Sequence, residues 1–481
     1  MTQFFHLLLA RIGVVPPQGM HGIGWVAMAT WGTQAVRLAT LAVLANFLAP
    51  NTFGFFAFAL AVFTVAQPVA GLGISGALVV KPELQDGTIA TALALAAAAG
   101  IAAMAVLFAG LLIMRSLDPQ LDELRSLGFM IPGLLFANIA NAALAVSRRR
   151  KEFRKLGLAI LAGEAAGGVT GIALAAGGWG IDSLVWRYVA TAAAMALIGV
   201  SMLRRDLALP RLRSIRGLLH YGLPVSGSET LAALRNRGDE LLIGALFGAT
   251  VLGIYSIARR YVDALRAALP SVIGDHAWPV LASLRDRNAA FADQLRRSLM
   301  LVAWIVWPAF VAVAALAPVW VPAVLGTEWS PAVRVVRMLC LVAMIQSVFA
   351  IPILAIVGLG HTGARLRLDV ALTLTTLTMI GLLASFGMLG LLSALLLANL
   401  LVLPYEYRVV ARRLPIDLKG PIAALPIPLG INLLLLVALI ALAKFAPIAT
   451  SPWPVLAIGL ALAGTVPLTM LLLRRKSVKP E

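Results

Sequence analysis

Charged residues are scarce in this sequence: 12% of the 481 residues are Asp, Glu, Lys or Arg, against about 25% in soluble domains. Hydrophobic residues make up 61%, and the mean hydropathy is +0.94. This composition excludes an ordinary soluble protein and predicts an all-α, polytopic membrane protein. The single cysteine, Cys340, lies in an apolar segment, so an intramolecular disulfide is excluded as well.

Other absences exclude classes of function. No GxxxxGK[ST] motif is present, so direct use of ATP is not expected. The five histidines are scattered and form no cluster of metal ligands, and we expect no cofactor. The longest polar stretch, around residues 283–298, is too short for a soluble catalytic domain. We therefore do not expect an enzyme.

Long hydrophobic runs are what the sequence has in abundance. A window of about 19 residues predicts about fourteen transmembrane helices. Their approximate ranges are 23–48, 53–79, 89–114, 127–146, 157–177, 182–203, 221–247, 251–273, 299–317, 334–358, 368–386, 389–407, 421–445 and 453–473.

The basic residues predict how these helices are oriented. Of the 39 Lys and Arg, those between spans fall on one side except Arg115 and Arg125. That side is cytoplasmic by the positive-inside rule, so both termini are expected in the cytoplasm. The net charge of +18 is then mostly a topology signal, and nucleic-acid binding is not expected. Residues 1–21 are predicted to form an interfacial segment and residues 474–481 a basic cytoplasmic tail.

An internal repeat predicts the architecture. Residues 47–59, FLAPNTFGFFAFA, align without gaps with residues 246–258, LFGATVLGIYSIA, at an offset of 199. A weaker match pairs GIDSL at Gly180 with GLLSAL at Gly390, and chance similarity is the alternative explanation. Six spans per repeat is an even number, so the two halves would be parallel. We expect six-helix lobes over residues 22–210 and 211–415, with two further helices over 416–473.

Several arginines fall inside the predicted spans. A charged side chain at mid-membrane costs at least about 2.5–3.5 kcal/mol and usually faces a bundle interior or a wet cavity. Guanidinium groups stay charged when desolvated and bind phosphate oxygens in bidentate fashion. We therefore predict a central cationic cavity for an anion between the lobes. Its candidate residues are Gln34, Arg37, Arg235, Arg237, Arg259, Arg260 and Arg266.

Acidic residues near these arginines leave alternatives open. Arg235 and Asp239 are four residues apart and can pair. Residues 235–240 then either form a self-neutralised buried network, or leave Arg237, which has no acid four residues later, to bind an anion. Asp239, Glu240 and Asp263 are also candidate coupling or cavity carboxylates, as is Glu164. Asp263 can pair with Arg259 or with Arg266.

Two further charges fall in the predicted fifth and sixth spans. Glu164 is isolated in an apolar span and either carries a coupling proton or donates a hydrogen bond to a neighbouring helix. Arg187 is expected to anchor the sixth span at the interface.

Four stretches carry a family resemblance. They are residues 44–84, GLPVSGSETL at Gly222, DELLIGALFGATVLGIYSIARR at Asp239 and LGTEWSPAVRVVRML at Leu325. They resemble the Wzx-type polysaccharide flippases of the multidrug/oligosaccharidyl-lipid/polysaccharide superfamily. The resemblance implies twelve or fourteen helices in two lobes around a V-shaped cavity. It also implies transport of an undecaprenyl-pyrophosphate-linked oligosaccharide from the cytoplasmic to the periplasmic leaflet.

The resemblance also implies roles for particular residues. In the related lipid II flippases, arginines of helices 1, 2 and 8 line the cavity. Arg37 matches helix 1, and Arg259 and Arg260 match helix 8, but helix 2 offers Gln67 in place of an arginine. The implied partners are the polyprenyl-pyrophosphate-linked oligosaccharide, membrane lipids and, as candidates, a polysaccharide polymerase and a chain-length regulator.

We therefore predict a flippase for surface polysaccharide biosynthesis that works by alternating access. One alternative is an ion-coupled drug antiporter of the same superfamily, but such a protein would need excess acid in its cavity. The other is a membrane glycosyltransferase or polymerase, which would need a longer extramembrane loop than the one around residues 115–125.

Cysteine labelling checks the predicted topology. Cysteines introduced at Gln120 and Glu328 should react with an impermeant reagent in intact cells. Cysteines at Arg150 and Ala289 should react only after the cytoplasm is opened. Labelling of Arg150→Cys from outside would contradict the whole span assignment.

Overall fold

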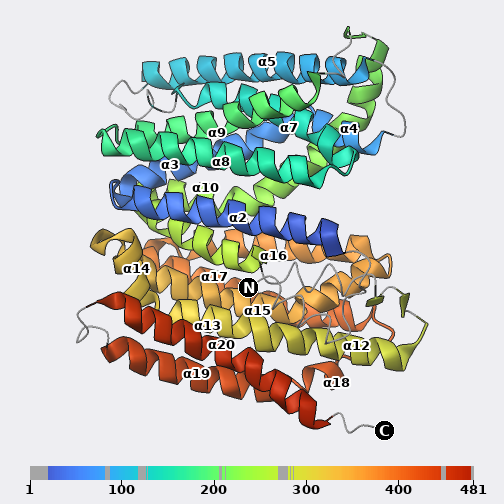
Figure 1. The fold of residues 1–481 in the computed structure, drawn as a ribbon, viewed down its shortest axis with the longest axis vertical. Coiled ribbons are helices and arrows are strands. Elements are labelled where there is room, and N and C mark those ends of the chain that lie inside the picture. Colours follow the sequence, from blue (N-terminus) through green and yellow to red (C-terminus); the bar gives the residue numbers. More distant parts are fainter. Residues whose placement is uncertain are drawn as a thin grey trace. The chain divides into compact units, whose positions relative to one another are not determined.

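The computed structural model describes residues 20–81, 87–117, 126, 128–204, 209–211, 213–268, 280–281, 283–284, 286–445 and 451–477. Nearly all of these residues are helical, and none of them lies in a strand. The contacts divide the chain into two compact units, Gln18–Gly253 and, in the main, Ile254–Glu481 (Figure 1). The predicted all-α class is confirmed.

The first unit is a bundle of membrane-length helices. Each helix packs on a neighbour in the order α2, α8, α9, α7, α5, and Figure 1 shows α2, α8 and α5 with nearly parallel axes. The short helix α4 also lies against α7. The elements are α2 (Met20–Ala45), α3 (Pro50–Ala70), α4 (Ile74–Val80), α5 (Thr88–Leu117), α7 (Ile131–Arg149), α8 (Phe153–Ala176), α9 (Ile181–Met202) and the first part of α10 (Arg213–Ala268).

The second unit repeats part of this arrangement. Helix α13 packs on α15, α15 on α17 and α16 on α17, as α5 packs on α7, α7 on α9 and α8 on α9 in the first unit. Helices α19 and α20 both pack on α13. Besides the end of α10, the elements are α12 (Asn288–Leu301), a π-helix (Val302–Val306), α13 (Trp307–Ala315), α14 (Ala317–Leu325), α15 (Ala332–Gly358), α16 (Thr362–Leu382), α17 (Gly387–Ala411), α18 (Lys419–Ile422), α19 (Pro426–Phe445) and α20 (Pro452–Ser477).

The helices agree with the predicted spans except at three places, one of which is the span 421–445, where α18 ends at Ile422 and α19 begins at Pro426. The second span is broken, because α3 ends at Ala70 and α4 begins at Ile74. The seventh and eighth spans are joined without a loop in α10, whose only interior break is Gly248 at φ 81° and ψ 175°. Ten helices of the described residues are long and apolar enough to cross a membrane, so the chain is a multi-pass membrane protein.

The described residues do not test every prediction about the fold. The count of about fourteen spans stays a prediction. The lobe boundary at 210/211 is another, since the part of α10 up to Gly253 lies in the first compact unit. The predicted interfacial segment 1–21, the loop around 115–125 and the end of the 474–481 tail lie largely outside the described residues.

Two glycines bring the start of α3 against α10. A Cβ atom added to Gly54 would overlap the carbonyl group of Ala249, and one added to Gly253 would overlap the carbonyl group of Pro50. Residues 50 and 54 match residues 249 and 253 at the offset of 199, so the same contact is made twice. The contact therefore agrees with the repeat and explains why both positions are glycine.

Alanine at either glycine should destabilise the protein. Gly54→Ala and Gly253→Ala each force backbone against backbone, and overpacking of this kind costs about 1–3 kcal/mol. The control is Gly381→Ala in α16, where an added Cβ has no neighbour within 4 Å. The melting temperature of the detergent-purified protein measures the effect. Equal melting temperatures for all three variants would contradict the close contact.

Candidate functional site

A single carboxylate joins three helices of the first unit. Glu164 of α8 accepts hydrogen bonds at Oε1 from Nε (3.1 Å) and Nη2 of Arg37 in α2. Its Oε2 lies 3.5 Å from Nη2 of Arg187 in α9. The Glu164 side chain is only 6% exposed. Arg37, Glu164 and Arg187 form a triad with one more positive charge than negative.

Glycines of α8 make this triad possible. Gly163, Gly167 and Gly171 recur every four residues, so they lie on one face of the helix. A Cβ added to any of them would press on α9, and at Gly171 it would lie 2.9 Å from Cβ of Arg187. Small residues at such spacing allow membrane helices to approach closely. The row of glycines therefore lets α9 approach α8 closely enough for Arg187 to reach Glu164.

The two arginines of the triad differ in their surroundings. The side chain of Arg187 is 9% exposed, and its Nε has no hydrogen-bond partner among the described residues. The side chain of Arg37 is 41% exposed. Its Nε and Nη2 donate to Glu164. Its Nη1 makes no hydrogen bond within the described part of the chain. Arg37 is thus the accessible arginine of the triad, and Glu164 fixes its orientation.

Two sequence predictions were wrong here. Glu164 is not an isolated carboxyl, because it is paired with both arginines. Arg187 is buried and paired with Glu164, so its side chain does not extend outward as that of an interface anchor would. The partners lie on different helices, 127 and 23 residues away from Glu164 in the chain. The glycine spacing of α8 is the only sequence signal that points to this close packing.

Residues 235–240, in the first part of α10, carry several charged side chains, and some of these are also paired. Nη1 of Arg237 donates to Oε1 of Glu240 at 2.7 Å, and the side chain of Glu240 is 1% exposed. The prediction that Arg237 lacks an acidic partner was wrong, because the partner is three residues away instead of four. Arg235 is exposed and Asp239 half-buried.

The second part of α10 has an excess of positive charge. Asp263 lies between two arginines: its Oδ2 is 3.2 Å from Nε of Arg259 and its Oδ1 is 3.9 Å from Nη1 of Arg266. Both predicted alternatives for Asp263 are thus realised together. Arg259 also lies over the ring of Tyr255, with Cζ 5.9 Å from its centroid. Arg260 is half-buried.

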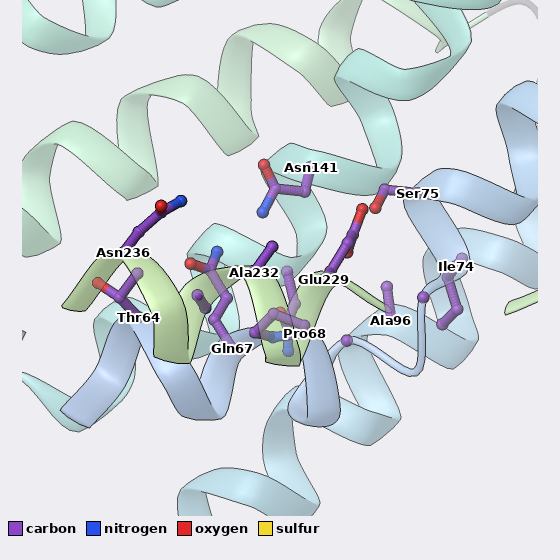
Figure 2. A pocket seen from close by; sticks show the side chains of 14 residues that line it. Thr64, Gln67, Pro68, Ile74, Ser75, Ala96, Asn141, Glu229, Ala232 and Asn236 are labelled. Carbon is purple, nitrogen blue, oxygen red and sulfur yellow. The ribbon is translucent and has the colours of Figure 1, made fainter. Parts of the chain in front are cut away.

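A cavity of about 340 Å³ with both polar and apolar lining residues lies within the first unit. Its walls come from α3, α4, α5, α7 and α10, and Figure 2 shows Gln67 and Asn141 extending toward the same space from different helices. The polar side chains that line it are Thr64, Gln67, Ser75, Asn138, Asn141, Glu229 and Asn236. None of the predicted arginines lines it, and Gln34 lies elsewhere, half-buried on α2.

Of these lining residues, the family resemblance pointed to Gln67, and the offset of 199 from Arg37 leads to Asn236. Helical spacing could have found more of them. Asn138 and Asn141 are three residues apart on α7, and Glu229 and Asn236 are seven apart on α10, so each pair shares a face. Over the described residues, no three His, Cys, Asp or Glu side chains lie together as a metal site.

The fold and the charged groups within its spans define the class of protein. Over 94% of this chain and 99% of the other, the fold matches "Lipid II flippase MurJ, inward closed conformation" with a TM-score of 0.72 and 12% identity. Over 79% of the chain and 95% of the other, it matches an inward-facing multidrug resistance transporter of the MATE family, with a TM-score of 0.62 and 14% identity. The chain thus has the fold of the MOP-superfamily transporters.

The sequence assigns the chain to a family within that class. The chain belongs to the family described as "Polysaccharide biosynthesis protein", whose model matches residues 43–334, more than half of its length. It is similar to the succinoglycan biosynthesis transport protein ExoT of Rhizobium meliloti (strain 1021), with 26% identity over 66% of this chain and 65% of that protein.

A second relative is the lipopolysaccharide biosynthesis protein WzxC of Escherichia coli (strain K12), with 23% identity over 68% of this chain and 67% of that protein. The matched part of the chain spans just under two thirds of the length of the succinoglycan transport protein. The resemblance read from the sequence is confirmed at the level of the family.

Removing the shared carboxylate should destabilise the protein. Glu164→Gln leaves Arg187 buried without a counter-charge, which costs about 3 kcal/mol or more. Glu152→Gln is the control, because it breaks the exposed pair with Lys155 and should cost less than about 1 kcal/mol. Unfolding in mixed micelles of rising SDS content measures both.

A double variant separates charge from packing. Glu164→Gln with Arg187→Met removes the buried charge together with its partner and should recover much of the lost stability. No difference in stability between Glu164→Gln and Glu152→Gln would contradict the buried triad.

Proposed function

We propose that the protein is a flippase that moves a polyprenyl-pyrophosphate-linked oligosaccharide across the bacterial inner membrane. The observation that carries the proposal is the triad of Arg37, Glu164 and Arg187. It holds net positive charge among helices of a membrane protein of the polysaccharide biosynthesis family, and one of its arginines is accessible. The printed names of two relatives, a succinoglycan transport protein and a lipopolysaccharide biosynthesis protein, support the same substrate class.

The triad suits a pyrophosphate for an electrostatic reason. An anion entering a low-dielectric region loses its hydration, at a cost of several kcal/mol or more unless it is paired. Arg37 offers charge-assisted guanidinium donors to the phosphate oxygens. Glu164 holds Arg37 in place, and Arg187 keeps the triad positive despite that carboxylate. The net charge thus remains available to the substrate.

The remaining arginines extend the proposal. Arg235, Arg259, Arg260 and Arg266 are proposed to contact the same anion during the transport cycle. Arg237 is expected to contribute less, because Glu240 already pairs with it. The sugars would travel through polar surroundings and the polyprenyl tail in lipid, by alternating access. Both termini are proposed to be cytoplasmic. A polymerase and a chain-length regulator are proposed as partners in the same pathway.

A drug antiporter is the second candidate, because the MATE transporters share the fold. A site for organic cations needs more negative than positive charge, and the triad has the opposite balance. A glycosyltransferase or polymerase is less well supported still, since one relative is named as a transport protein and the structural neighbours are transporters. The proposal is therefore a transporter and not an enzyme.

Complementation tests the proposal. In a strain that lacks its own flippase for the source organism's polysaccharide, the wild-type gene should restore surface polysaccharide. Arg37→Ala should reduce export at least tenfold at normal protein levels. Arg37→Lys should restore part of it, because an ammonium keeps the charge and loses the planar fork.

The control is Arg412→Ala, an exposed arginine just after α17, which should export normally. Full export by Arg37→Ala would refute the role of the triad. Failure of the wild-type gene to restore any polysaccharide would refute the flippase itself.

A further inference from the structure

The cavity in the first unit has a chemistry that the pyrophosphate does not use. Its polar lining consists of amides, hydroxyls and one carboxylate, and no Arg or Lys is among the described residues that line it. A phosphate would find no cation there and would be repelled by Glu229. An apolar drug would leave the amides without partners. The lining therefore selects a neutral ligand rich in hydrogen-bonding groups.

Amides and hydroxyls suit the hydroxyl groups of a sugar. A sugar hydroxyl both donates and accepts, and each Asn or Gln side chain offers donors and an acceptor together. A carboxylate such as Glu229 accepts only, which matches hydroxyl donors. Glycine and alanine, at Gly71, Gly73, Ala232 and Ala233, fill the spaces between the polar groups. These small residues let a bulky ring approach the amides.

The polar groups of the cavity are available for a ligand. Within the described part of the chain, no side-chain hydrogen bond engages Gln67, Asn141 or Glu229. Asn138 is fixed, because its Nδ2 donates to the carbonyl of Ala70 at 3.1 Å. That bond leaves its Oδ1 as an acceptor. Polar groups without partners are costly to bury, so the half-buried Gln67 and Asn141 call for a ligand or water, and the exposed Glu229 is open to one.

The break between α3 and α4 is a second, independent observation. The chain leaves the helix at Gly71, and Leu72 (φ 50°) and Gly73 (φ 62°) are left-handed. Pro68 lies one turn earlier, and its carbonyl accepts a hydrogen bond from Ser226 of α10 at 2.7 Å. Non-helical backbone at membrane depth occurs where it lines a cavity or is buried in protein, and broken helices mark the substrate sites of many transporters.

We propose that this cavity binds a glycosyl unit of the transported oligosaccharide, with Gln67, Asn141 and Glu229 as its hydrogen-bonding residues. The proposal rests on the proposed flippase function and adds a site for the glycan separate from the arginines. Asn138 is a positioning residue, since its amide holds the broken backbone of α3. The triad and the cavity thus divide the substrate: charge is bound by Arg37, and the neutral sugar by amides.

Binding measurements with two lipids test this division. The first is the lipid-linked oligosaccharide that accumulates in source cells from which this gene has been deleted. The second is sugar-free undecaprenyl pyrophosphate. The Kd of each is measured by thermophoresis with the full-length protein in nanodiscs.

Gln67→Leu and Asn141→Leu should each raise the Kd of the oligosaccharide lipid about tenfold, as expected for loss of a hydrogen bond worth about 1.4 kcal/mol. The Kd of the sugar-free lipid should stay unchanged. Arg37→Ala should raise the Kd of both lipids. The control Asn46→Leu makes the same chemical change at the end of α2, outside the cavity, and should alter neither.

A third variant tests whether the effects of the two leucine substitutions come only from misfolding. Ala232→Leu removes no polar group and fills part of the cavity, so it should weaken binding of the oligosaccharide lipid alone. A Kd for that lipid unchanged in all three cavity variants, or raised equally for both lipids, overturns the glycosyl site and leaves the flippase proposal intact. A wild-type protein that binds neither lipid overturns the flippase proposal and the glycosyl site with it.

Discussion

Within a lipid bilayer, a charged side chain must find its partner inside the protein, and the first unit meets this constraint through one carboxylate. Glu164 contacts arginines from α2 and α9, so three helices are connected at one point. The close packing of α8 on α9 follows from the same need, because the glycines of α8 make room for Arg187. Within the triad, the negative charge of Glu164 thereby offsets one of the two arginines, and one positive charge remains.

That remaining charge gives the site its selectivity. A neutral pair would be a structural contact only, whereas a triad with a positive remainder attracts an anion. The cavity differs from the triad in charge, since no Arg or Lys is among the described residues that line it. A lipid-linked oligosaccharide has both a charged and a neutral part, and one uniform cavity would bind one part well and the other poorly. Separate groups in the same bundle avoid that conflict.

The sequence predicted the helices well because hydropathy is a local property. Nearly every predicted span coincides with a helix, and the offset of 199 reappears in the contact of Gly54 with Ala249. Breaks and partners were harder to predict. The helix breaks at Leu72, but the hydrophobic run continues through that residue, so hydropathy gives no sign of the break. The pairing of Glu164 depends on helices distant in the chain. Arg237 shows a local failure, since both i+3 and i+4 partners are possible on a helix and only the structure decides between them.

The reciprocal contact of Gly54 and Gly253 has one more consequence. Side chains that interdigitate lock two helices in register, because any rotation must first move a rotamer. Here main chain meets main chain, with no side chain on either glycine to interlock. At these two glycines, a small shift of residues 50–54 against residues 249–253 therefore needs no rotamer change.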